Sequence, residues 1–231
     1  HSASCGYQTS PALAGFALLD DFGYVEPRHF MYGPAGAGKR TDEWDCVWMK
    51  ADPGCVGQVV GHPLADWEAV ESYRWPDPLA YWRWDEHEFN ETICEARRRG
   101  QYIIAYAGNL FEKMQWVRGY EELLTDIMLY PERVQLLIER VNAFNLATID
   151  RWKGYDVDAI LFSDDWGTQQ RLMIPPRLWR SLFRPAYEQQ FGAVHAAGFD
   201  VHLHTDGNTI EIIPDFIEMG VDVLNPQLSA M

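Results

Sequence analysis

The pattern of apolar and polar positions predicts a regular alternation of strands and helices from residue 101 onward. Four short apolar runs are rich in β-forming residues and are predicted as strands. The segments between them carry apolar residues at helical spacing. Such a β-α-β-α-β order with short connections predicts a parallel sheet covered by helices. The predicted strands are 101–106, 158–162, 199–204 and 221–224, and the predicted helices are 110–117, 120–130, 131–153, 176–197 and 210–219.

The first hundred residues are less regular. Residues 1–60 are rich in glycine and proline and predict loops and short strands, with 57–60 as a candidate strand. Residues 65–73 and 85–99 have helical patterns. Because there is no internal repeat or low-complexity segment, residues 1–231 are predicted to form a single domain.

Polar side chains gather directly after the predicted strands. Several strand ends that carry polar groups at once are typical of the active site of a (β/α)₈ barrel. We therefore predict the α/β class and a (β/α)₈ TIM barrel. Four strands are clearly predicted where a barrel has eight, so we expect a partial barrel that lacks strands at its carboxyl-terminal end. A missing amino-terminal strand stays an open alternative. The strand-end groups are Asn109, Asp164, Asp165, Thr205, Asp206 and Asn225.

Charge limits the kinds of partner. The chain has 19 lysines and arginines against 34 aspartates and glutamates, which gives a formal net charge of −15. Such a surface repels phosphate backbones and anionic lipids, so we expect a small-molecule substrate and no nucleic acid or membrane partner. No apolar run is long enough to span a bilayer. The short apolar stretch 13–19 has no basic flank, so no signal peptide is predicted.

The cysteines indicate neither a disulfide framework nor a zinc site. They are scattered, form no CxxC pair and lie beside no histidine cluster. Free thiols in an acidic, enzyme-like chain fit a reducing compartment, and we predict a cytoplasmic location. The four residues are Cys5, Cys46, Cys55 and Cys94.

Residues 33–39 resemble a phosphate-binding loop but lack its essential features. They fit the GxxxxGK pattern, yet Arg40 stands where Ser or Thr would hold magnesium. No convincing apolar strand precedes the segment. We therefore predict a flexible glycine-rich loop and no nucleotide cofactor.

Two adjacent carboxylates follow the predicted strand 158–162. Asp164 and Asp165 can bind a metal ion, act as acid and base, or hold a substrate cation. A single aspartate at such a position would more simply cap a helix or loop, but two in one cluster favour function. Strand alternation places their side chains on opposite sides. Both are candidate catalytic residues, and Trp166 and Gln169 are candidate substrate-binding residues.

Two histidines share one side of the predicted strand 199–204. His202 and His204 are two residues apart, and Asp206 continues the same spacing. His204 and Asp206 can share zinc or another divalent metal ion, although a third protein ligand is not evident. A pair of hydrogen-bonded structural histidines is the alternative. We expect His202, His204 and Asp164 to face the barrel interior, with His204 as a further candidate catalytic residue.

Other polar residues near strand ends are predicted to bind substrate. With His202, this group comprises Asn109, Asn208 and Asn225.

With these residues identified, the chain resembles the uroporphyrinogen decarboxylase superfamily. It is most similar to the branch that contains corrinoid-linked methyltransferases. The resemblance extends from about residue 32 to residue 227 and is specific for the superfamily, not for one activity. It implies a (β/α)₈ barrel of which this chain forms the central part. The matching stretches are 42–47 (DEWDCV), 163–169 (SDDWGTQ), 204–208 (HTDGN) and 220–226 (GVDVLNP).

Similarity to the methyltransferase branch makes methyl transfer our leading expectation. Methyltransferase members bind zinc through a His-x-Cys pair and a further cysteine, and the zinc activates a thiol that accepts a methyl group from a corrinoid. Here the pair is His204 and Asp206. A carboxylate in place of the thiolate makes the site harder and disfavours thiolate-type zinc. We expect a methyltransferase that acts on a small methylated substrate or with a corrinoid protein, in which Asp164 orients or protonates a leaving group.

Two alternatives remain open. One is decarboxylation of uroporphyrinogen or another carboxylated aromatic compound, although the chain lacks the arginine-rich motif with which the decarboxylase binds substrate carboxylates. The other is a non-catalytic barrel fragment that binds a ligand.

Overall fold

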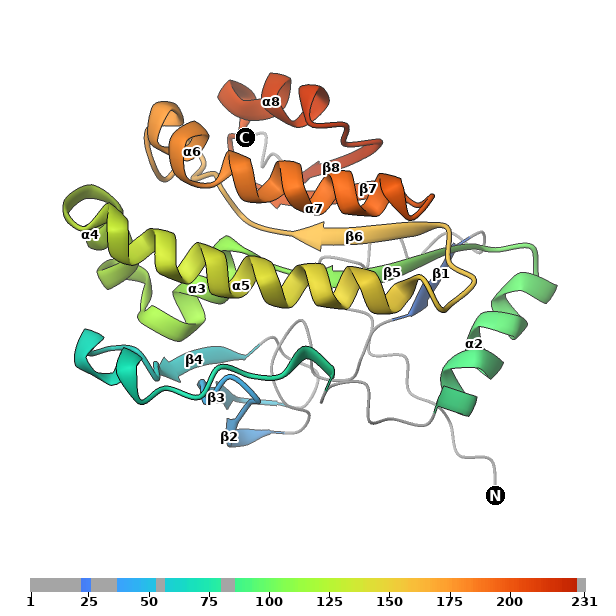
Figure 1. The fold of residues 1–231 in the computed structure, drawn as a ribbon, viewed down its shortest axis with the longest axis horizontal. Coiled ribbons are helices and arrows are strands. Elements are labelled where there is room, and N and C mark those ends of the chain that lie inside the picture. The colour runs from blue at the N-terminus through green and yellow to red at the C-terminus, as the bar shows by residue number, and fades with distance from the viewer. Residues whose placement is uncertain (1–21, 26–36, 53–56, 80–85, 228–231) are drawn as a thin grey trace.

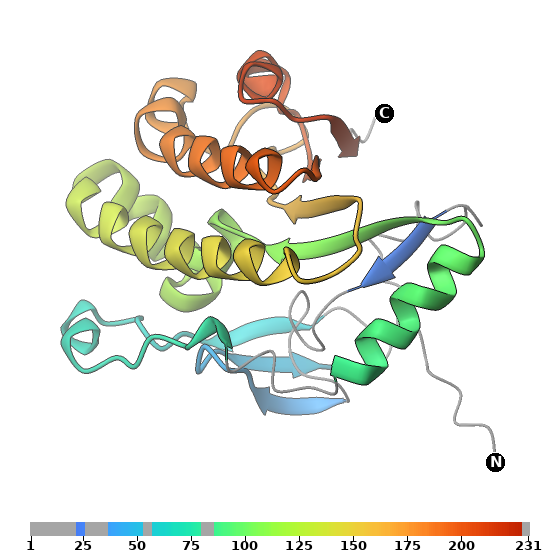
Figure 2. The same cartoon turned by 45° about the vertical axis from the view of Figure 1, so that its right-hand side comes forward.

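Two sheets organise the part of the chain that the computed structural model describes, residues 22–25, 37–52, 57–79 and 86–227 (Figures 1 and 2). The larger sheet is parallel and has the strand order β1-β5-β6-β7-β8. The smaller sheet is antiparallel and has the order β2-β3-β4. The strands are β1 (Phe22–Val25), β2 (Gly38–Thr41), β3 (Val47–Lys50), β4 (Gln58–Gly61), β5 (Tyr102–Gly108), β6 (Ala159–Ser163), β7 (Asp200–Asp206) and β8 (Val223–Gln227).

Helices connect the strands of the parallel sheet, as a parallel order requires. This arrangement of five parallel strands with their crossover helices is that of an incomplete TIM barrel and confirms the predicted fold class. Among the described residues, no helix has both the length and the apolar character needed to cross a membrane. The helices are α2 (Glu86–Arg98), α3 (Phe111–Arg118), α4 (Tyr120–Leu129), α5 (Pro131–Trp152), α6 (Pro176–Leu182), α7 (Arg184–Ala196) and α8 (Ile213–Glu218), with 3₁₀ turns η1 (Trp67–Glu71) and η3 (Ile210–Ile212).

Helices α5 and α7 lie against one face of the parallel sheet (Figure 1). The Trp152 indole of α5 donates a 3.0 Å hydrogen bond to the Tyr106 carbonyl, and Phe162 of β6 contacts Phe191 of α7 at 5.2 Å between ring centres. Because side chains alternate along a strand, the neighbours of Phe162 point to the opposite, inner face. Where the strands reach their carboxyl ends, this inner face borders the edge at which a barrel places its functional groups.

Two predicted helices are broken at prolines. The predicted helix 176–197 is in fact α6 followed by α7, and Pro185 lies in the first turn of α7. Proline lacks the N–H that an uninterrupted helix needs and its ring clashes with the preceding turn, whereas it fits a first turn well. In the same way the predicted helix 210–219 divides into η3 and α8, with Pro214 in the first turn of α8.

The amino-terminal half contains further differences. The candidate strand 57–60 is present as β4, but it belongs to the small antiparallel sheet. Residues 38–41, predicted in part as a flexible loop, form β2 because they pair with β3, while residues 33–36 lie outside the described part. The predicted helix 65–73 is only a five-residue 3₁₀ helix, since none of its side chains is fully buried to support a longer helix.

Candidate active site

The candidate site lies where β6 and β7 end, at the carboxyl edge of the parallel sheet. Ser163 pairs with His204 in the register of these strands. The pairing continues past β6, because the Asp164 N–H donates to the His204 carbonyl and the Gly167 N–H donates to the Asp206 carbonyl, both at 3.1 Å. The two chain segments therefore stay side by side at the edge where barrel enzymes place their active sites.

Two glycines allow this close approach. Gly207 has a φ of +80°, and a Cβ on either Gly167 or Gly207 would overlap the backbone of the other. The backbone N–H of Asp206 donates to Oδ1 of Asp165 at 2.9 Å. Because glycine alone fits this contact, the two glycines fix Asp165 beside Asp206.

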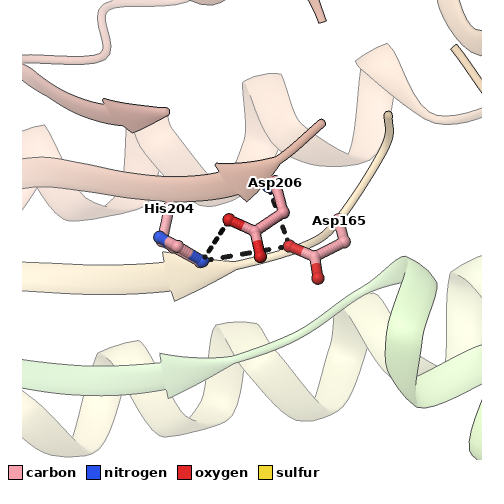
Figure 3. A group of neighbouring side chains, drawn as sticks. All are labelled: Asp165, His204 and Asp206. Carbon is pink, nitrogen blue, oxygen red and sulfur yellow. Dashed lines mark hydrogen bonds and ion pairs between the residues drawn. The ribbon is translucent and has the colours of Figure 1, made fainter. Parts of the chain in front are cut away.

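Asp165, His204 and Asp206 form a cluster at this edge (Figure 3). Nε2 of His204 lies 3.3 Å from Oδ1 of Asp206 and 3.9 Å from Oδ1 of Asp165. One possible ligand atom from each residue lies within 4.8 Å of the other two. The His204 side chain is buried, whereas those of Asp165 and Asp206 are 35% and 45% exposed. The cluster therefore opens to solvent on its carboxylate side.

The donor set of this cluster fits a divalent metal ion. Oδ1 of Asp206 is buried and makes no hydrogen bond, although it lies within ion-pair distance of His204. Burial, followed by the charge of Asp165, raises the pKa of Asp206. A bound cation would relieve this repulsion. One imidazole and two carboxylates suit zinc, iron or manganese, and Asp165 supplies the third possible ligand that was not evident from the sequence.

Asp164 points away from the cluster and caps α3. It is 1% exposed. Its Oδ2 accepts from the Leu110 N–H at 2.7 Å and the Tyr187 hydroxyl at 2.8 Å, and its Oδ1 accepts from the Glu112 N–H at 2.9 Å. Burial raises its pKa to about 7 in spite of these three donors. The prediction that Asp164 faces the barrel interior is wrong, because strand alternation gives that direction to Asp165.

Glu112, which was not among the predicted site residues, lies near Asp165. Its side chain accepts a 2.5 Å hydrogen bond from Nδ2 of Asn109. Asn109 is itself fixed by the Tyr106 hydroxyl and the Ser163 carbonyl, each at 2.6 Å. Burial and then the charge of Asp165 raise the pKa of Glu112 well above the usual carboxyl value. Asn109 follows β5 directly, and Glu112 comes three residues later in the first turn of α3. A search for polar side chains after strand ends could therefore have found Glu112 if it had been extended by one helical turn.

Trp166 belongs to the aromatic core. Its indole has no exposed surface, stacks on Phe111 at 3.9 Å between ring centres and donates to the Tyr187 hydroxyl at 2.9 Å. The structure therefore does not support the predicted substrate contact. Trp166 instead packs the loop after β6 against α3 and α7.

Gln169 and Asn208 lie in the loops that follow the two strand ends. Nδ2 of Asn208 donates to the Gln170 carbonyl at 3.1 Å, and its Oδ1 accepts from the Ile210 N–H at 3.3 Å. Gln169 is exposed. The Asn208 side chain thus orders its own loop, and substrate binding by either residue stays a prediction.

His202 lies on the same inner face of β7 as His204, two residues closer to the start of the strand. Its ring stacks on Tyr102 at 5.7 Å between centres, with Nε2 3.5 Å from the Tyr102 hydroxyl. Its Nδ1 is buried and has no hydrogen-bond partner among the described residues, and burial lowers its pKa. Asn225 is half-buried and pairs with His204 in the β7–β8 register. Substrate binding by His202 and Asn225 stays a prediction.

Comparisons with known proteins agree with this fold. The family model of uroporphyrinogen decarboxylase (URO-D) matches residues 50–227. A methyltransferase from Methanosarcina mazei superposes with a TM-score of 0.65 at 14% identity over 92% of this chain, which spans 60% of that protein's length. An HpcH/HpaI aldolase from Desulfitobacterium hafniense DCB-2 gives a TM-score of 0.27 at 15% identity, over 62% of this chain and 72% of its own, which is too weak to support an argument. No curated protein matches the chain.

The matched region contains both strand ends and therefore the whole cluster of Asp165, His204 and Asp206. The likeness to the methyltransferase at 14% identity supports the fold and leaves the reaction open. The chain belongs to the uroporphyrinogen decarboxylase family.

Proposed function

We propose that the protein is a methyl-transferring enzyme that works at a metal centre formed by Asp165, His204 and Asp206. The cluster itself carries this proposal, because three ligand atoms meet within 4.8 Å at the edge where barrel enzymes place their chemistry. The methyltransferase that shares this fold supplies the candidate reaction, methyl transfer. The methyl group would come from a corrinoid on a partner protein or from a small methoxyl or methylamine compound.

The three side chains have different tasks in this proposal. A divalent ion held by them would act as a Lewis acid on the group that accepts or releases the methyl. His204 is the rigid ligand because it is buried within β7. Asp165 and Asp206 are partly exposed and present their oxygens at the open edge. The contact between Gly167 and Gly207 keeps the two carboxylates adjacent.

We assign proton donation to Glu112 in place of Asp164. Both oxygens of Asp164 are engaged by donors inside the protein. Glu112 is oriented by Asn109, and its raised pKa keeps it neutral to a higher pH than an ordinary carboxyl group. An oxygen or nitrogen atom that loses a methyl group needs a proton, which a neutral acid near Asp165 can donate.

Metal binding is tested directly by calorimetric titration of metal-free protein with Zn²⁺ and Co²⁺ under anaerobic conditions. We expect one bound ion per chain, and at least tenfold weaker binding for His204→Ala, Asp165→Ala and Asp206→Ala. His195→Ala is the matched control. His195 lies on α7, away from the cluster, and pairs with Asp222, which precedes β8. Failure of the wild-type protein to bind either ion would remove the metal centre.

Methyl transfer is tested with methylcobalamin and a panel of small thiols, and with methoxylated and methylamine compounds in the presence of a corrinoid acceptor. We expect metal-dependent demethylation, followed by the absorbance change of the corrinoid. Metal-replete protein that binds the ion but shows no turnover above the protein-free reaction would overturn methyl transfer and leave the metal centre in place.

Decarboxylation is the second candidate, and the match to the uroporphyrinogen decarboxylase family model favours it. In that reaction a neutral Glu112 would protonate the pyrrole carbon as carbon dioxide leaves. Incubation with uroporphyrinogen and chromatography of the products decides between the two. Loss of carboxyl groups without any turnover of methylcobalamin would replace our first proposal with the second.

A further inference from the structure

A buried lysine follows Glu112 in the first turn of α3. Lys113 is 6% exposed. Its Nζ lies 4.2 Å from the ring centre of Trp116 and 5.3 Å from that of Trp44. In the part of the chain that the structure describes, no oxygen accepts a hydrogen bond from this ammonium group and no carboxylate pairs with it. The ammonium group therefore lies against two indoles and has no polar partner among the described residues.

Such a group is costly to bury. An ammonium group has three N–H donors and loses its hydration on burial. Burial lowers the pKa of Lys113, even though the charge of Asp42 acts to raise it. Indole faces attract a cation, but they offer it no oxygen acceptor. The N–H groups therefore find their acceptors in water or in a bound anion.

Asp42, the charged neighbour with the largest effect on Lys113, is engaged elsewhere. Its Oδ1 accepts from the backbone N–H groups of Trp44 at 2.9 Å and Cys46 at 2.8 Å. Its Oδ2 accepts from the indole N–H of Trp48 at 2.7 Å. Three bonds hold this carboxylate in the turn before β3, so it does not turn toward the lysine.

The other acidic neighbours favour their neutral forms. Glu43, Cys46 and Glu112 also act on Lys113 electrostatically. Burial is the main cause of a raised pKa in each of them. Burial therefore favours the neutral form of each group, which reduces the negative charge that an anion would meet beside the lysine.

We propose that Lys113 anchors a small oxyanion, a carboxylate or a phosphate group, where α3 meets the β2-β3-β4 sheet. Two or three oxygens of such a group would accept the free N–H donors in charge-assisted bonds. The aromatic walls are fixed, because Trp116 packs on Trp48 and Trp44 packs on Phe144, both at 4.9 Å between ring centres. Lys113 is not a member of the cluster of Asp165, His204 and Asp206, and anion binding by it does not depend on methyl transfer.

The test uses the lysine side-chain signals in nuclear magnetic resonance. The chain has four lysines, Lys39, Lys50, Lys113 and Lys153, so each signal can be assigned by a Lys→Met variant. Benzoate and inorganic phosphate are titrated separately. We expect the Lys113 signal to shift saturably with at least one of them and its pKa to rise on binding. Benzoate alone identifies a carboxylate site and phosphate alone a phosphate site, whereas an equal response to the neutral benzamide would overturn the proposal.

Variants provide the second readout. Lys113→Met is expected to weaken binding of the preferred anion at least tenfold, and Lys113→Arg to keep binding within about threefold because it retains the charge. Lys50→Met is the matched control, since Lys50 is also 6% exposed but lies in β3. If Lys113→Met does not fold, the wild-type titration and Lys113→Arg decide. No saturable shift at Lys113, or equal binding by a folded Lys113→Met, would overturn the site.

Discussion

Asp164→Ala and Asp165→Ala remove neighbouring carboxylates, and we expect them to impair different properties of the protein. Asp164 accepts hydrogen bonds from the Leu110 N–H, the Glu112 N–H and the Tyr187 hydroxyl inside the protein. Asp165 is 35% exposed and accepts a hydrogen bond from the Asp206 N–H. The first variant should lose stability and the second should lose metal binding.

The magnitude follows from the donors that each variant leaves behind. A buried donor without an acceptor costs about 1–3 kcal/mol. Asp164→Ala leaves three such donors, and some relaxation of α3 lowers the total to about 3–5 kcal/mol of the free energy of unfolding. Asp165→Ala removes one bond at a partly exposed edge and should cost about 1 kcal/mol or less. Denaturant unfolding near pH 4, where folded Asp164 keeps its proton, measures both when followed by circular dichroism.

The raised pKa of Asp164 gives this prediction a pH dependence. In the unfolded chain an aspartate loses its proton near pH 4, whereas folded Asp164 keeps it up to about pH 7. Between these values the folded state binds more protons, so stability falls as pH rises. A pKa that moves from near 4 to about 7 on folding changes the free energy of unfolding by about 4 kcal/mol. The stability advantage of the wild type over Asp164→Asn, a neutral variant, should be fully present below about pH 4 and shrink by this amount above pH 7.

The control is metal binding. Asp164→Asn, measured where it is folded, should bind Co²⁺ within a few fold of the wild type, whereas Asp165→Ala should bind at least ten times more weakly. Equal stability of the Asp164 and Asp165 variants would refute the capping role of Asp164. A stability advantage that grows with pH would show that its three donors outweigh burial.

Three further changes probe other parts of the molecule. Gly207→Ala should destabilise the protein by about 3 kcal/mol or more and abolish metal binding, because its Cβ would overlap the neighbouring strand end; Gly198→Ala, with a similar φ of +85° but open space around it, should cost about 1 kcal/mol. Asp206→Cys, which introduces a thiolate ligand, should shift calorimetric preference from Mn²⁺ toward Zn²⁺, and an unchanged preference would place Asp206 outside the coordination sphere. Hydrogen bonds from Arg180 lower the pKa of Asp215. The stability advantage of the wild type over Asp215→Asn should therefore be present above about pH 4 and disappear as the pH falls further. Thermal unfolding across this range measures it, and an advantage that stays constant would contradict the ion pair.

The order of strands and helices was predictable because it depends on local periodicity. Apolar spacing of 2 and 3.6 residues marked β5, β6, β7 and the long α5 directly. The same sequence also held the signals for the breaks that were missed, since Pro185 and Pro214 each open a helix. The apolar spacing continues on both sides of each proline, so the pattern predicted one continuous helix in each case. A proline inside a helical pattern breaks or kinks the helix, and here it breaks it.

The metal cluster was only partly predictable because one of its members depends on a contact between strands. His204 and Asp206 share a strand, so alternation alone placed them together. Asp165 joins them through the register of β6 against β7 and the contact of Gly167 with Gly207, and neither can be read from one strand by itself. The donors that engage Asp164 lie on α3 and α7, which are far from it in sequence.

The dipeptide Asp164-Asp165 therefore links the two halves of the candidate site through the alternation of one strand. Asp165 turns inward toward His204 and Asp206. Asp164 turns outward and holds the first turn of α3, the helix that begins with Phe111 and carries Glu112 and Lys113. Loss of Asp164 should consequently displace the proposed acid and the proposed oxyanion anchor without removing a metal ligand. Where a helix begins over the outer face of a strand end, two adjacent carboxylates are therefore expected to have different roles. One points inward and can bind a metal ion, and the other points outward and accepts hydrogen bonds from the N–H groups at the start of the helix.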